Sequence, residues 1–255
     1  MAFSSLTEKE IQKIAIEKIN SELDEWEIEI WQFIRDWLDP AVVSIKVFTS
    51  GSTSFPREIQ HGKGCILNSA RLTCYALQLK HGDKALLCLP ANRISGMMMI
   101  VRSIWNKMDL YCMRPSSNPL SQLTDKDNFD FAAFTPSQLY EFEKNMQRIE
   151  KIRKLLIGGE DISARLMKNM QLLNNASYAT FGMTETISHI ALRRLNGPNP
   201  DRYFKTFEGI TVSTDERKCL IIEAPELGIH SLITNDVIHF ISPVEFEWLG
   251  RKDNL

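Results

Sequence analysis

The sequence contains a hydroxyl-rich stretch, Phe48-Thr49-Ser50-Gly51-Ser52-Thr53-Ser54-Phe55-Pro56-Arg57, around which the rest of the chain can be interpreted. It gathers hydroxyl side chains, a glycine, a proline and a cation. Small hydroxyl residues around a glycine leave the backbone free to bend and expose several N–H and O–H donors. Donors that face a common point, with a cation nearby, form a cradle for a polyphosphate. Taken alone, such a stretch is more typical of a Ser/Thr-rich surface turn, so the chain around it decides between the two.

The chain around this stretch alternates between strand and helix patterns. An apolar run, Val42, Val43, Ile45 and Val47, predicts a buried strand that leads into it. Further strands are expected at 58–61, 84–89, 109–113, 129–134, 154–157 and 176–180, and helices at 65–81, 96–106, 136–146 and 163–173. This alternation predicts a mainly parallel sheet with helices on both faces. Short strands at 209–213, 219–224, 230–234 and 237–241 predict a small β-rich subdomain after it.

The N-terminal residues 7–38 predict helix. Thr7 and Glu10 have the spacing of a capping box, in which each side chain satisfies a free N–H group at the helix start. A break near Asn20-Ser21 divides the region, and Asp39-Pro40 ends it. We therefore expect a helical segment over residues 1–40 that packs on the core.

Composition narrows the class of protein. The 255 residues are 44% hydrophobic and 24% charged, as in ordinary globular proteins, and the net charge of −2 argues against a nucleic-acid binder. Five cysteines without a C-x-x-C pair argue against a zinc site and against a disulfide framework. The N-terminus lacks a signal-peptide pattern, and the apolar run 96–101 is too short to span a bilayer. The expectation is a cytoplasmic protein without a stable membrane anchor.

Four polar stretches follow predicted strands, at the places where open parallel α/β sheets bind ligands. They are the hydroxyl-rich stretch, Gly158-Gly159-Glu160, Phe181-Gly182-Met183-Thr184-Glu185 and Thr234-Asn235-Asp236. Each has a plain alternative, since Gly-Gly-Glu is typical of a helix start and Thr-Asn-Asp of a hydrogen-bonded turn. Their order and placement together favour a nucleotide site.

With Gly250-Arg251-Lys252-Asp253 near the C-terminus, these motifs resemble the adenylate-forming superfamily of acyl-CoA synthetases, nonribosomal adenylation domains and luciferases. Within it, three further stretches are similar to the o-succinylbenzoate–CoA ligase family of menaquinone biosynthesis. They are L-P-A-N-R-I-S-G-M-M-M-I-V-R (89–102), S-N-P-L (117–120) and F-G-M-T-E-T-I-S-H (181–189). The resemblance implies a carboxylate that attacks the α-phosphate of Mg-ATP, giving an acyl-adenylate and pyrophosphate, before coenzyme A displaces AMP.

The resemblance also implies a division of the chain. The large domain would comprise an α/β nucleotide- and acid-binding core over 41–197 and the β-rich subdomain over 198–249. Residues 250–255 would be a hinge to a small C-terminal domain that supplies a lysine and rotates between the two half-reactions. That domain is absent from this sequence, so we expect the chain to bind nucleotide and acid but to adenylate poorly. The oligomeric state is not predicted.

The superfamily motifs assign roles to residues of this chain. Hydroxyls and backbone of the first motif would hold the β- and γ-phosphates, and the Gly-Gly-Glu motif would line the adenine slot, with Phe181 on the ring. Thr184 would contact the α-phosphate, Glu185 would bind Mg²⁺, Asp236 the ribose, and Arg251 the ribose or phosphate. The nucleotide set is Thr49, Ser50, Gly51, Ser52, Thr53, Gly158, Gly159, Glu160, Phe181, Asp236 and Arg251, and the catalytic set is Thr184, Glu185 and Arg57.

The acid itself has two candidate contact regions. One is Arg93, Ser95 and Gly96 in the loop after Pro90, and the other is Ser188 and His189 after the Thr-Glu pair. Because o-succinylbenzoate has two carboxylates, the one that is not activated needs a polar or cationic partner, and Arg93 is the favoured one. A solvent-exposed surface arginine is an equally good interpretation of Arg93.

Departures from the superfamily pattern keep alternatives open. Ser54 and Asn235 replace usual glycines, and Arg57 replaces a usual lysine, although a guanidinium can still pair with phosphate. One alternative is a ligase for another aryl or fatty acid. Another is a non-catalytic adenylate-binding module. An amino-acid activator is disfavoured, because the candidate pocket residues are neutral or basic.

Overall fold

The computed structural model describes residues 1–48 and 57–254. Its α-helices are α1 (Glu8–Ile19), α2 (Glu25–Leu38), α3 (Lys63–Ala76), α4 (Ile94–Trp105), α5 (Phe142–Glu150) and α6 (Ala164–Met170). Its strands are β1 (Ser44–Phe48), β2 (Glu58–Gly62), β3 (Lys84–Leu87), β4 (Asp109–Cys112), β5 (Phe129–Phe134), β6 (Ile152–Ile157), β7 (Ala176–Gly182), β8 (His189–Arg194), β9 (Phe204–Thr206), β10 (Thr211–Thr214), β11 (Cys219–Ala224), β12 (Ile229–Ser242) and β13 (Glu245–Arg251). Short 3-10 helices include η3 (Pro136–Leu139), η4 (Thr184–Thr186) and η6 (Lys252–Asn254).

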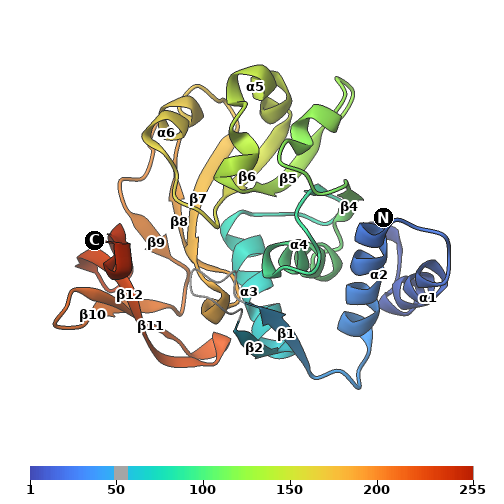
Figure 1. Cartoon of the computed structure of the whole chain (residues 1–255), viewed down its shortest axis with the longest axis horizontal. Helices are drawn as coiled ribbons and strands as arrows, with labels where there is room; N and C mark the ends of the chain where they lie inside the picture. Colours follow the sequence, from blue (N-terminus) through green and yellow to red (C-terminus); the bar gives the residue numbers. More distant parts are fainter. Residues whose placement is uncertain (49–56, 255) are drawn as a thin grey trace.

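The N-terminal region forms the two expected helices. The Thr7 side chain and the Glu10 carboxylate cap the start of α1 reciprocally, as the spacing predicted. Helix α2 begins after Asp24, whose backbone N–H donates to Glu27 at 3.3 Å. The two helices pack as a pair beside α4, at the blue end of the chain in Figure 1.

One large sheet organises the rest of the chain. Its strand order is β10-β11-β12-β13-β9-β8-β7-β6-β5-β3-β4. The strands β4, β3, β5, β6 and β7 are parallel neighbours, and every pairing from β7 through β8 to β10 is antiparallel. The expected parallel α/β core is therefore confirmed. The strands after residue 198 continue the same sheet rather than forming a sheet of their own.

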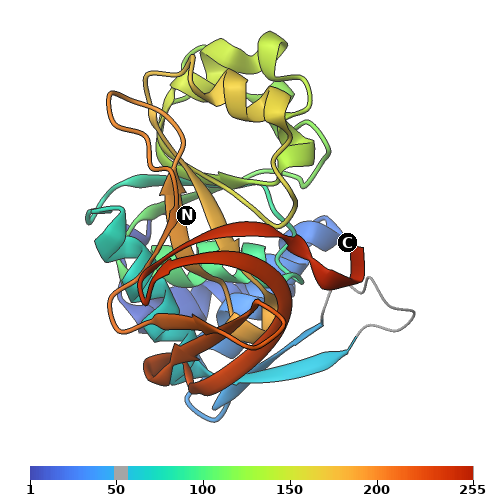
Figure 2. The ribbon, with the colours of Figure 1, turned by 90° about the vertical axis from the view of Figure 1, so that its left-hand side faces the viewer.

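Helices cover both faces of the parallel strands. Figures 1 and 2 show α5 and α6 on one side of these strands and α3 and α4 on the other. Strand β3 is buried on both faces, since Ala85, Leu86 and Leu87 are each at most 1% exposed. Helix α4 is almost wholly buried, which explains its run of apolar residues Met97 to Val101.

Two expectations about strands are wrong. The residues before the hydroxyl-rich stretch form β1, which pairs only with β2 in a separate antiparallel hairpin, and only one of its faces is buried. Val43 is 75% exposed, because the side chains of a strand alternate between its two faces. Thr234-Asn235-Asp236 is not a loop after a strand but the middle of the antiparallel strand β12. Register shifts in β12 absorb the turn-like residues without ending the strand.

Three strands were not predicted. They are β8, β9 and β13, which lie in the sheet between the parallel strand β7 and the antiparallel strands β12, β11 and β10. Strands β8 and β9 pair antiparallel with close neighbours in the sheet, so a strict strand–helix alternation does not reveal them. Within residues 1–48 and 57–254, no helix is long and apolar enough to cross a membrane.

Candidate active site

The η4 turn carries Thr184 and Glu185 at the carboxyl end of β7, where the sequence placed them. The turn is held close to the start of β8. A Cβ on Gly182 would lie 2.3 Å from the backbone oxygen of Ser188, so only glycine fits here. After Glu185 the chain makes a γ-turn, in which Ser188 N–H donates to Thr186 oxygen at 2.7 Å across Ile187.

The backbone of Ile187 is strained, since its φ is +68° and its side chain is β-branched and fully buried. Such conformations cost of order 1–3 kcal/mol and persist only where the surroundings fix them. Here the γ-turn separates two polar groups of residues. Thr184 and Glu185 lie before it and Ser188 and His189 after it.

His61 on β2 ties the hairpin to the η4 turn. Its Nε2 lies 2.8 Å from the carbonyl oxygen of Thr184, and because a carbonyl only accepts, Nε2 carries the proton. Burial lowers the pKa of His61, against the opposing effects of this hydrogen bond and of the charge of Glu185. His61 therefore holds the turn as a neutral donor. From the sequence, this histidine was expected only as part of a strand.

Asp236 lies in the middle of β12. Its side chain is 6% exposed, and its Oδ1 accepts a hydrogen bond from the indole N–H of Trp248 at 2.9 Å. It pairs across the ladder with Arg251 on β13. The hydrogen bond that Arg251 donates to Asp253, followed by the charges of Asp236, Asp253 and Glu185, raises the pKa of Arg251 against the opposing effect of burial. Asp236, Arg251 and Glu185 therefore form one electrostatic cluster built from β12, β13 and η4.

Gly158, Gly159 and Glu160 follow β6 at the same edge of the sheet. The N–H of Gly158 donates to Phe134 oxygen at 3.1 Å, and Glu160 accepts hydrogen bonds from the Ser137 hydroxyl and backbone N–H at 2.9 and 3.2 Å. Glu160 therefore anchors the start of η3, which follows β5. The motif joins the ends of two neighbouring parallel strands.

Phe181 packs inside an aromatic cluster. Its ring is 9% exposed and lies 5.0 Å from the ring of Phe246 and 5.8 Å from that of Phe204, measured between centroids. These two partners come from β13 and β9, which were not predicted. The ring links β7 to the antiparallel part of the sheet.

A buried cation stands on the other side of the γ-turn. Arg102 on α4 is 2% exposed, and its Nη2 donates to the hydroxyl of Ser188 at 2.9 Å. Its Nε is buried without a hydrogen-bond partner, and no carboxylate of the described residues lies within 4.0 Å of it. Burial lowers the pKa of Arg102 to about 10, which leaves the guanidinium charged at neutral pH.

The residues around Arg102 do not compensate its charge. Burial raises the pKa of the Cys74 thiol to about 12, so this neighbour is neutral. Burial and the charge of Arg102 hold the pKa of His189 well below its usual range, so His189 is neutral too. An uncompensated buried guanidinium is unfavourable by several kcal/mol unless an anion reaches it. Arg102 was not among the residues predicted from the sequence. The sequence feature that could have revealed it is an arginine at the end of an otherwise apolar helical run.

The other acid-site candidates lie elsewhere. Arg93 and Ser95 are exposed at the start of α4, about two and a half turns and about two turns before Arg102. Gly96 is buried, and a Cβ there would lie 2.1 Å from Pro90 oxygen, so this glycine serves close packing. Ser188 and His189 are the candidates that the structure brings to Arg102.

The residues of the phosphate-binding proposal are only partly described. Thr49, Ser50, Gly51, Ser52 and Thr53 lie outside the described residues. Arg57 is exposed just before β2. Among the described residues there is no group of three or more metal-ligating side chains. Glu185 remains suited to Mg²⁺, because this ion uses one or two carboxylates and takes its other ligands from phosphates and water.

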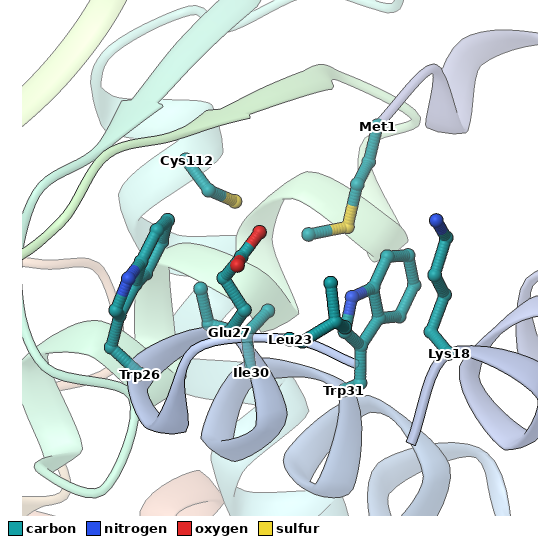
Figure 3. Close-up of a pocket in the computed structure, with 8 residues that line it drawn as sticks. All are labelled: Met1, Lys18, Leu23, Trp26, Glu27, Ile30, Trp31 and Cys112. Carbon is teal, nitrogen blue, oxygen red and sulfur yellow. The ribbon is translucent and has the colours of Figure 1, made fainter. Parts of the chain in front are cut away.

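A cavity of about 240 Å³ lies away from all these groups. Figure 3 shows its lining, with Trp26 and Trp31 of α2 beside Glu27, and Met1 and Cys112 opposite. None of the residues that the sequence assigned to nucleotide or acid lines it. Glu27 already serves there as the cap of α2.

The fold and these polar groups define a class of protein. Residues 5–218 match the family model described as AMP-binding enzyme, and the chain belongs to this family. The 2-succinylbenzoate–CoA ligase of Haemophilus influenzae is 26% identical over 172 residues, which are 66% of this chain and 36% of that protein. The ligase of the same name from Bacillus subtilis is 26% identical over 193 residues, 73% of this chain and 39% of that protein.

Solved structures agree with the fold. An acyl-CoA synthetase (AMP-forming)/AMP-acid ligase II-like protein from Dyadobacter fermentans is 33% identical, with a TM-score of 0.84 over 95% of this chain and 69% of that one. The o-succinylbenzoate coenzyme A synthetase of Bacillus subtilis in complex with ATP and magnesium ion is 19% identical, with a TM-score of 0.70 over 82% of this chain and 50% of that one. The chain spans about a third of the length of the curated relatives.

Proposed function

We propose that this chain is the nucleotide- and acid-binding part of an o-succinylbenzoate–CoA ligase. The observation that carries the substrate class is Arg102, a buried cation beside Ser188 that has no carboxylate partner within residues 1–48 and 57–254. A dicarboxylic acid brings one carboxylate to be activated and a second that can pair with this guanidinium. The four curated relatives, each a 2-succinylbenzoate–CoA ligase, support the same acid.

The alternatives fit Arg102 less well. A fatty or simple aryl acid has no second negative charge, so its binding would leave the guanidinium buried and unpaired, at a cost of several kcal/mol. A non-catalytic module has no need to keep an uncompensated cation in its interior. An amino-acid substrate carries a cationic amine, which the charge of Arg102 would repel.

The nucleotide would bind on the other side of the γ-turn. Asp236, whose second oxygen is not taken by Trp248, can accept the ribose hydroxyls, and Thr184 can donate to the α-phosphate. Glu185 would hold Mg²⁺, which when bound neutralises phosphate charge. His61 keeps the turn that carries both residues in place. The sequence-based roles of the hydroxyl-rich stretch, the Gly-Gly-Glu motif, Arg57 and Arg251 stay part of this proposal.

The chemistry requires one bound acid to present its reacting carboxylate to the nucleotide while its other carboxylate meets Arg102. An oxygen of the reacting carboxylate attacks the α-phosphorus of ATP, the bond to the bridging oxygen breaks, and pyrophosphate leaves with its electron pair. Preplaced donors stabilise the charge that develops on the phosphoryl oxygens. Coenzyme A thiolate then attacks the acyl carbon and AMP leaves. We place the reaction in the cytoplasm, consistent with five cysteines that form no disulfide.

Calorimetric titration tests the substrate class. The ligands are a non-hydrolysable o-succinylbenzoyl-adenylate mimic and the same mimic with the unactivated carboxylate replaced by a carboxamide. We expect the carboxylate form to bind at least about a hundredfold more tightly, since a buried charge pair is worth about 2–5 kcal/mol when one partner is lost. Benzoyl and fatty acyl mimics are further controls. Equal affinity for the two matched mimics would refute the proposal.

A further inference from the structure

Four side chains form a continuous line of hydrogen bonds that ends on Arg102. In order, the relay runs Thr73–His189–Ser188–Arg102. The first contact joins Thr73 Oγ1 and His189 Nε2 at 3.1 Å, the second joins His189 Nδ1 and Ser188 Oγ at 3.2 Å, and the third joins Ser188 Oγ and Arg102 Nη2 at 2.9 Å. Thr73, His189 and Arg102 are 0%, 7% and 2% exposed, so water does not supply alternative partners.

The first step of the relay determines which acceptor receives the hydroxyl proton of Thr73. Thr73 lies in α3, and its Oγ1 is 3.1 Å from the backbone oxygen of Ser69 one turn earlier. Two oxygens at this distance need a proton between them, and a carbonyl oxygen has none. The single hydroxyl proton of Thr73 is therefore directed to Ser69, and toward His189 the threonine can only accept.

The second step fixes the tautomer of His189. Because Thr73 only accepts, Nε2 carries the ring proton and donates it. The ring is neutral, since burial and Arg102 keep its pKa well below its usual range. Nδ1 is then unprotonated and can only accept, so the Ser188 hydroxyl donates its proton to Nδ1.

The third step fixes the orientation of the Ser188 hydroxyl. With its proton committed to His189, the Ser188 oxygen turns a lone pair toward Arg102 and accepts from Nη2. Arg102 is thus held by one neutral acceptor, while its buried Nε has no partner among the described residues. A guanidinium held in this way keeps donors available for an incoming anion.

We propose that Thr73 and His189 are positioning residues that set the specificity for a dianionic acid. They act through Ser188 on the orientation of Arg102, and they touch neither the nucleotide nor the reacting carboxylate. This inference rests on the proposed function, because it assumes that Arg102 receives the unactivated carboxylate. If Thr73 could not accept, the ring proton would move to Nδ1, and the Ser188 oxygen would then accept from both Nδ1 and Arg102. The serine proton would lose its fixed partner, and the hold of Ser188 on Arg102 would loosen.

The test compares Thr73→Val, which keeps the shape and removes the acceptor, with Thr73→Ser, which keeps the hydroxyl. One readout is the ¹⁵N chemical shifts of His189, assigned among the five histidines with His189→Asn. The other is the ratio of affinities for the carboxylate and carboxamide mimics. We expect the ring proton of His189 on Nε2 in the wild type and in Thr73→Ser, and a shift of this proton toward Nδ1 in Thr73→Val. We also expect the ratio of carboxylate to carboxamide affinity to be about tenfold smaller in Thr73→Val alone, which is equivalent to about 1.4 kcal/mol.

Two different results separate this inference from the proposed function. If the wild type does not prefer the carboxylate mimic, the proposed function fails. If the wild type does prefer it, but Thr73→Val keeps both the full ratio and the Nε2–H tautomer, the relay has no positioning role. Should Thr73→Val not fold, Thr73→Ala removes the same acceptor with less crowding and gives the same two readouts.

Discussion

Replacement of Arg102 by methionine will abolish the preference for a dianionic acid and will not destabilise the protein. Methionine fills the space of the arginine stem without a charge. We expect the affinity for the o-succinylbenzoyl-adenylate mimic to fall by about a hundredfold or more, since the ligand carboxylate loses a buried cation, worth about 2–5 kcal/mol. The affinity for the carboxamide mimic should change much less. Calorimetric titration of both mimics measures the two effects.

The stability of this variant provides a separate readout. Arg102 is a buried cation that pairs with no carboxylate in the part of the chain that the structure describes, and replacing such a charge by an apolar side chain is often neutral or stabilising. The melting temperature of Arg102→Met should therefore equal or exceed that of the wild type. A large loss of stability would mean that Arg102 has a purely structural role.

Arg93→Met is the matched comparison, because the sequence favoured Arg93 for the same carboxylate. The structure leaves Arg93 exposed at the start of α4. The two assignments predict opposite results for the two variants. If Arg93→Met weakened the binding of the carboxylate mimic and Arg102→Met did not, the carboxylate would bind Arg93 and the assignment of Arg102 would be wrong.

Replacement of Glu185 by glutamine will remove the effect of Mg²⁺ on ATP binding. Glutamine keeps the shape of the side chain but is a poor ligand for this ion, which favours carboxylates. In the wild type we expect ATP to bind about ten- to a hundredfold more tightly with Mg²⁺ than with EDTA, a difference of about 1.4–2.7 kcal/mol. In Glu185→Gln the two affinities should become equal.

A control variant excludes a general effect of lost negative charge. Glu216→Gln changes an exposed residue between β10 and β11, far along the chain from η4, and should keep the full Mg²⁺ effect. A Glu185→Gln protein that is folded and still shows the wild-type Mg²⁺ dependence would contradict the assignment of Glu185. A Glu185→Gln protein whose main defect is unfolding would also contradict this assignment.

Much of the architecture follows from local patterns in the sequence. The capping box at Thr7 and the largely apolar segment 129–134 predicted element positions that the structure confirms, because caps and largely apolar strands depend on neighbouring residues. The hairpin of β1 and β2 and the long strand β12 did not follow. Their partners are set by antiparallel pairings and register shifts that local periodicity does not encode.

The candidate site was also predicted only in part from the sequence. Motif spacing was enough to place Thr184 and Glu185 at the end of a parallel strand, since such positions are fixed by chain order in an α/β sheet. Arg102 and His61 escaped notice because their roles come from contacts with residues more than eighty positions away in the chain. An arginine inside an apolar helix is visible in the sequence, but its missing counter-ion is visible only after folding.

We assign the unactivated carboxylate of the acid to Arg102, and a crystal structure with the o-succinylbenzoyl-adenylate mimic is the decisive test of this claim. We predict that this carboxylate lies within hydrogen-bond distance of the Arg102 guanidinium, with Ser188 still in contact with His189 and the adenylate beside Asp236. A carboxylate that instead lies in solvent or against Arg93, with Arg102 still unpaired, would contradict the claim.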